Sequence, residues 1–265
     1  MIEAQEKIRA LFYSNVTDEN HRFEFDLFNV SVTQKLWSTE QDYKELVGLD
    51  INDFQEPPYV LDTKSDDIAG SKTQSISTMT SQTRPVNIQE YCRHLNRLLD
   101  GFFMNSLSAL DALAHQIRVL YDFPLKGTKP EKKAEDIYIS KIRDMLLESH
   151  PKSEVGRLLQ QKLKPEPKPD WFLKFESLRN CTTHESLIGA EISPVWDQIE
   201  RCYKAPKIIL PDDPKEIPFT YIENREAISF CQTIFDNIES LLNEVYEAIL
   251  TDIQNNNNIL PIGKP

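Results

Sequence analysis

The clearest helical pattern in the chain is NREAISFCQTIFDNIESLLNEVYEAILTDI, residues 224–253. Its apolar residues recur at every third or fourth position, which is the spacing of one face of an α-helix. The main stripe comprises Ile228, Cys231, Phe235, Ile238, Leu242, Val245 and Ile249, and Ile234, Leu241 and Leu250 widen it. The pattern predicts a long helix whose broad apolar face packs against other helices.

Residues 86–121 carry the same period. The apolar positions there are Ile88, Tyr91, Leu95, Leu98, Leu99, Phe102, Leu110, Leu113, Ile117 and Leu120. Shorter helical patterns lie between the two long ones, over 131–149, 155–163 and from Asp170 onward. A further helix is predicted from Ser193-Pro194, because serine caps and proline opens helices, with 208–210 in a loop after it. Residues 86–253 therefore predict an up-and-down helical bundle.

Residues 1–61 have a mixed pattern. Phe23, Phe25 and Leu27 alternate with charged residues, and Phe28, Val30 and Val32 alternate in the opposite phase. This alternation predicts one bulged strand or two short strands, followed by a short helix. Residues 62–85 are rich in Ser, Thr, Asp and Gln and predict a flexible linker. The predicted fold class is mainly all-α, with a mixed or α+β extension over 1–85, the bundle over 86–253 and a polar tail over 254–265.

Composition and charge limit the classes of function. The chain has 265 residues and a formal net charge of −12, which favours solubility and repels polyanions as a whole. The four cysteines and five histidines show no paired ligand spacing, so we expect free thiols and no metal. No apolar run approaches the roughly 18 residues that a membrane span needs. We expect a cytoplasmic chain with no membrane contact.

Arg179-Asn180-Cys181-Thr182-Thr183-His184 is the stretch that points most directly to chemistry. It pairs a fixed cation with a group that titrates near neutral pH, and such a pair can handle a phosphate. In an unbroken helix Arg179 and His184 would point about 140° apart. A shared site therefore requires a break, which the β-branched Thr182 and Thr183 favour. The alternative is that Arg179 forms a salt bridge with an acid of a neighbouring helix.

Two further groups are candidates for substrate binding. Asp111 and His115 lie on one polar stripe of the helix predicted over 86–121, and this stripe either lines a site or is a solvated face. The lysines over 126–133 and 162–174, including Lys174, either form a basic funnel near Arg179 or are solvated loop charges.

These features resemble the HEPN superfamily of helical bundles. Its signature is an arginine, usually followed by a polar residue, with a histidine four to six residues after the arginine; Arg179, Asn180 and His184 match it. Residues 102–114 resemble the first long helix of that family and 224–253 its closing helix, so the resemblance covers roughly 86–253.

The resemblance implies a metal-independent endoribonuclease, as in toxin–antitoxin, phage-defence or RNA-processing systems. It implies a homodimer in which two motifs meet, RNA as the substrate, no cofactor, and an antitoxin or other protein as a possible partner. His184 would be the general acid or base, Arg179 would hold the phosphate, and Asn180 would orient the histidine or a phosphate oxygen. The resemblance equally allows a non-catalytic module that binds RNA or protein.

Overall fold

The computed structural model describes residues 1–54, 86–123, 137–163, 170–184, 188–200 and 202–255, without the side chains of Asp170 and of residues 182–184. The described part is mainly helical with a small antiparallel sheet, as the sequence predicts for the fold class. The linker predicted over 62–85, the lysines over 126–133 and residues 256–265 of the predicted tail lie outside it.

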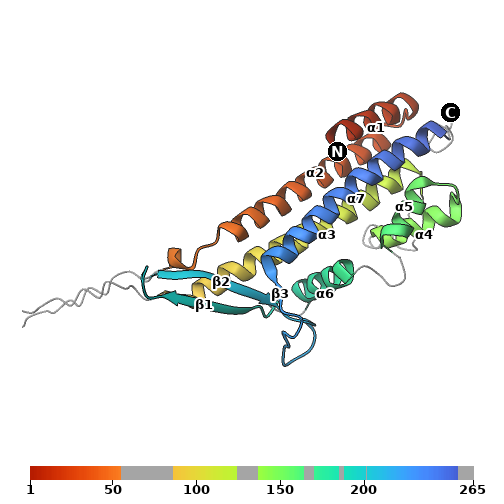
Figure 1. Cartoon of the computed structure of the whole chain (residues 1–265). Coiled ribbons are helices and arrows are strands. Elements are labelled where there is room, and N and C mark those ends of the chain that lie inside the picture. The colour runs from red at the N-terminus through yellow and green to blue at the C-terminus, as the bar shows by residue number, and fades with distance from the viewer. Residues whose placement is uncertain (55–85, 124–136, 164–169, 185–187, 201, 256–265) are drawn as a thin grey trace, which may run out of the picture.

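Two long helices form the centre of the molecule. They are α3 (Ile88–Leu120) and α7 (Ala227–Asn255), close to the two long helices that the periodicity predicts. They run side by side with the long helix α2 (Glu19–Gly48) in Figure 1. The shorter α1 (Ile2–Asn15) packs on α2 and α7. The short 3-10 helix η1 (Ile51–Phe54) follows α2 and contacts α3.

Three shorter helices complete the bundle. They are α4 (Ile139–Ser149), α5 (Glu154–Leu163) and α6 (Asp170–His184). The first two pack on each other and α5 packs on α7, while α6 packs on α3 and α7. Phe172, Phe175 and Leu178 are the buried side of α6, and the Phe175 ring lies 6.3 Å from that of Phe103 on α3. The helical patterns at 155–163 and from Asp170 are thus confirmed.

A hydrogen-bonded chain of buried and partly buried side chains ties α1, α2, α3 and α7 together. Gln5 of α1 donates to the Tyr246 hydroxyl of α7 at 2.9 Å, and that hydroxyl donates to Gln116 of α3 at 2.9 Å. Gln116 in turn donates to Asn29 of α2 at 2.9 Å. Because buried polar groups need partners, this chain favours one register of the four helices. Residues 1–54 therefore share the core of α3 and α7.

The strands predicted over residues 23–32 are wrong, since these residues lie inside α2. The cause is that α2 has apolar residues on two opposite faces. Phe25 and Val32 are buried, whereas Phe23, Leu27 and Val30 are exposed. Residues on opposite sides of one helix produce an alternation that resembles the period of a strand.

The helix predicted from Ser193-Pro194 is also wrong. Strand β1 (Glu191–Asp197) pairs antiparallel with β2 (Cys202–Leu210), and β2 pairs with the short β3 (Arg225–Glu226) that leads into α7. β1 is an edge strand, and its pairing is irregular between Ser193 and Val195, around Pro194. A proline without an N–H is tolerated at such an edge. The segment 208–210, predicted as a loop, belongs to β2.

Candidate functional site

Arg179 lies near the end of α6, next to the buried side of that helix. It is partly exposed, and its guanidinium donates to the Asn180 side-chain oxygen at 3.1 Å. The next residue, Cys181, is buried, and its thiol lies 3.6 Å from the Pro214 carbonyl oxygen, which fixes this part of α6 to the loop before β3. Two of the three predicted catalytic residues, Arg179 and Asn180, are therefore in contact.

The helix does not break between Arg179 and His184. α6 is continuous from Asp170 to His184, so the predicted break at Thr182 is wrong. Threonines carry only a small intrinsic penalty in a helix, and packing of the apolar side easily outweighs it. In a continuous helix residues five apart point about 140° apart. The side chain of His184 itself lies outside the described part.

Asp111 is the charged neighbour of Arg179 across the contact between α3 and α6. Burial raises the pKa of the Asp111 carboxyl to about 6, and the positive charge of Arg179 opposes that rise. An acid in this environment changes charge near neutral pH. The structure thus brings together Arg179, Asn180 and one of the residues predicted to bind substrate, Asp111.

The other two predicted substrate-binding residues have partners elsewhere. The His115 ring stacks on Phe28 of α2, with ring centroids 4.7 Å apart and planes 11° from parallel. Lys174 donates to the Asp212 carbonyl and forms an ion pair with Glu223 at 3.3 Å, both in the loop that precedes β3. Lys174 therefore holds that loop against α6.

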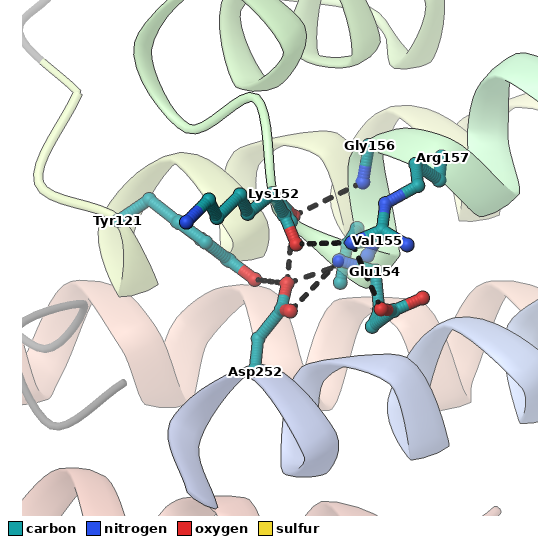
Figure 2. A network of polar contacts seen from close by, with 8 residues as sticks. Tyr121, Lys152, Glu154, Val155, Gly156, Arg157 and Asp252 are labelled. Carbon is teal, nitrogen blue, oxygen red and sulfur yellow. Dashed lines mark hydrogen bonds and ion pairs between the residues drawn. The ribbon is translucent and has the colours of Figure 1, made fainter. Parts of the chain in front are cut away.

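A second polar cluster, which the sequence reasoning missed, surrounds the buried carboxylate of Asp252 near the end of α7. Tyr121 and Ser153 donate their hydroxyl protons to it at 2.7 and 2.6 Å, and the backbone N–H groups of Glu154 and Val155 donate at 2.7 and 3.3 Å. Figure 2 shows this carboxylate directed at the first turn of α5. The negative charge thus satisfies the free N–H groups at the start of α5.

The Asp252 cluster forms one wall of a surface pocket of about 590 Å³. Ser149, His150, Pro151, Lys152, Ser153, Glu154, Arg157, Asp252 and Asn255 line this pocket. Arg157, a cation in the lining, already has partners within the chain. It pairs with Glu154 at 3.1 Å and donates to the Lys152 carbonyl, as Figure 2 shows. A sequence signal for Asp252 exists, because it stands three residues after Ile249 on the apolar stripe of α7, where an acid needs buried donors.

The outer face of α2 is a third candidate. It comprises Asn20, Phe23, Leu27, Val30, Gln34, Trp37 and Gln41, spaced alternately by three and four residues. These positions fall within an arc of about 100° and extend over about 30 Å of helix. Phe23, Leu27, Val30 and Trp37 are 70%, 51%, 52% and 61% exposed. Such a spacing is typical of a helix that packs against another helix.

Comparison with protein-family models, with curated proteins and with solved structures finds no match to this chain. Among the described helices none has the length and apolar character needed to cross a membrane. Within the same residues no group of histidine, cysteine or acidic side chains is arranged to hold a metal ion.

Proposed function

We propose that this protein is a non-catalytic helical interaction module that binds a helix of another protein on the outer face of α2. The observation that carries the proposal is the exposure of Phe23, Leu27, Val30 and Trp37 on one uncharged stripe. Scattered apolar residues on a surface need no explanation, whereas a row of large ones along one helix face marks a contact surface. The spacing of three and four residues fits an α-helical partner.

The geometry around α6 supports an interaction role over catalysis. Arg179 already has an acid beside it and an amide bonded to it, and α6 continues without a break to His184. A cation that is compensated in this way contributes to the packing of α6 on α3. A chain of net charge −12 is also poorly suited to holding the RNA backbone.

Selection from a displayed library of helical peptides tests the proposal. Peptides with apolar heptad positions and randomised flanking positions are enriched on the full chain, and the enriched peptides are then measured on two variants. Val30→Ser should weaken binding by about tenfold, because it removes one apolar contact. Val47→Ser is the matched control, since Val47 is also 52% exposed on α2 but points about 130° from the centre of the outer face.

Two results would refute the interaction proposal. One is a selection that yields no peptide. The other is a set of enriched peptides that bind the Val30→Ser and Val47→Ser variants equally well, because the contact would then not involve the outer face of α2.

A second candidate function, a HEPN-type endoribonuclease, is favoured by one observation. Asp111, with its pKa at about 6, lies beside the partly exposed Arg179, so a group that exchanges protons near neutral pH adjoins a cation that can hold a phosphate. Because α6 is continuous, His184 would have to join Arg179 and Asn180 of a second copy, in a homodimer with RNA as the substrate. An antitoxin partner and a role in phage defence belong to this candidate.

Incubation with single-stranded RNA in EDTA separates the two functions. The nuclease would release 2′,3′-cyclic phosphate ends and spare DNA, which lacks the attacking 2′-hydroxyl. Its activity would be lost in Arg179→Ala and in His184→Ala. The interaction module predicts intact RNA with the wild-type chain and with both variants.

A further inference from the structure

The residues that flank the outer face of α2 carry the information about its partner. On one side the flanking positions are Glu24, Ser31, Ser38 and Glu45, and on the other they are Glu19, Asp26, Thr33 and Glu40. All charges at these eight positions are negative. In packed helix pairs the flanking positions select the partner through their charges.

Four of the five acids at these positions already form ion pairs with cations of the same chain. Arg118 pairs with Glu24, and Arg9 bonds Asp26 through two contacts of 2.7 and 2.8 Å. Arg97 pairs with Glu45 at 3.4 Å, and Lys44, one turn beyond Gln41, pairs with Glu40 at 2.6 Å. These cations approach from α1, α3 or the end of the face, so the carboxylates border the uncharged stripe and no basic residue occupies a flanking position.

A second copy of the chain is a poor fit to this surface. Two outer faces packed against each other would bring the flanking acids of one copy against the flanking acids of the other, in either direction of the helices. Facing like charges oppose association and are a common device against the wrong partner.

We infer that the outer face of α2 receives an amphipathic helix of a different protein, with apolar residues on its contact face and lysine or arginine at its flanking positions. This inference rests on the proposed interaction function and adds the chemistry of the partner. The apolar row provides the contact, Gln34 and Gln41 interrupt it and fix the register, and the acidic borders attract the basic flanks.

The experiment uses one peptide that binds the outer face, synthesised with lysine, glutamine or glutamate at all flanking positions. Its binding to the full chain is followed by the fluorescence of Trp37 after Trp171→Phe and Trp196→Phe, since the chain has three tryptophans. At low salt the lysine peptide should bind at least tenfold more tightly than the glutamate peptide. This difference should shrink at about 0.5 M salt, where charges are screened over a few ångströms.

A charge reversal on the protein tests whether a flanking acid causes the preference for the lysine peptide. Glu45→Lys should narrow the preference for the lysine peptide severalfold. Glu239→Lys, which makes the same charge change at an exposed position of α7, should leave it unchanged.

The outcomes separate the inference from the function on which it rests. If the glutamate or glutamine peptide binds as tightly as the lysine peptide, the partner chemistry is wrong while the interaction function stands. If the chain sediments as a dimer that Val30→Ser dissociates, a second copy occupies the face and the inference is overturned. If no helical peptide requires Val30, both proposals fail.

Discussion

Asp252 and Asp111 are acids on the two central helices, and their surroundings differ sharply. Asp252 on α7 receives four hydrogen bonds, two from hydroxyls and two from the backbone of α5. Asp111 on α3 has no hydrogen bond from the described residues, and Arg179 is the charge that compensates it. Asp252 is buried and Asp111 is partly buried, but only Asp252 is surrounded by donors.

Burial alone therefore does not determine the role of an acidic side chain. Where donors converge, the carboxyl oxygens have hydrogen-bond partners and the segments that supply the donors are fixed to them. Where burial acts with few compensating groups, the pKa rises and the acid titrates in the neutral range. The first arrangement builds structure, while the second makes stability depend on pH.

The largest effect is expected when Asp252, the acid with four donors, is neutralised. Asp252→Asn should destabilise the protein by about 2–4 kcal/mol, because hydrogen bonds to a charged group are lost and an amide group is placed among donors. Urea unfolding measures the global loss. Amide exchange at Glu154 and Val155 should accelerate more than in the centre of α3, since the start of α5 loses its cap.

Glu239→Gln on the same helix is the matched control, because Glu239 is exposed. It should change stability by less than about 0.5 kcal/mol. If Asp252→Asn behaves like Glu239→Gln, the Asp252 cluster has no structural role.

The second prediction concerns Asp111, where replacing the acid by asparagine should stabilise the protein rather than destabilise it. Its folded pKa of about 6 lies above the ordinary value of 3.8, so the stability linked to its protonated form is present below pH 3.8 and is lost as the pH rises through about 6. Asp111→Asn should therefore be more stable than the wild type at pH 8 by about 1–3 kcal/mol, with the gain reduced because Arg179 loses its counter-charge. Urea unfolding at pH 4, 6 and 8 measures the difference, which should nearly vanish at pH 4.

Asp53→Asn, at an exposed position of η1, is the control for loss of one charge and should show little pH-dependent gain. A wild-type stability that does not fall relative to Asp111→Asn between pH 4 and 8 would contradict the assigned environment of Asp111.

The two central helices were predictable because each has one broad apolar face and nothing competes with that signal. α2 was not, since its outer face carries Phe23, Leu27 and Val30 while the inner face carries Phe25 and Val32. The hairpin was missed because Ser193-Pro194 also suits a helix start, and only the edge position of β1 reveals why proline fits there.

The candidate site divides in the same way. The contact between Arg179 and Asn180 follows from their being neighbours, but the electrostatic interaction of Arg179 with Asp111 depends on how α6 packs on α3. The donors to Asp252 lie up to 131 residues away in the sequence. Local patterns carry no information about contacts between such distant segments.

The smallest expected effect is a change in the pKa of Asp111 on replacing Arg179, whose positive charge lowers that pKa. Arg179 lowers the pKa of Asp111 against the larger effect of burial, so Arg179→Gln should raise that pKa further, by less than burial itself does. Carboxyl NMR titration measures the change. Lys174→Gln is the control, since Lys174 is held by Asp212 and Glu223 and should leave the Asp111 titration unchanged. An unchanged Asp111 pKa in Arg179→Gln would mean that the two side chains do not interact, and Arg179 would then be better placed to hold a phosphate than to stabilise the contact between α3 and α6.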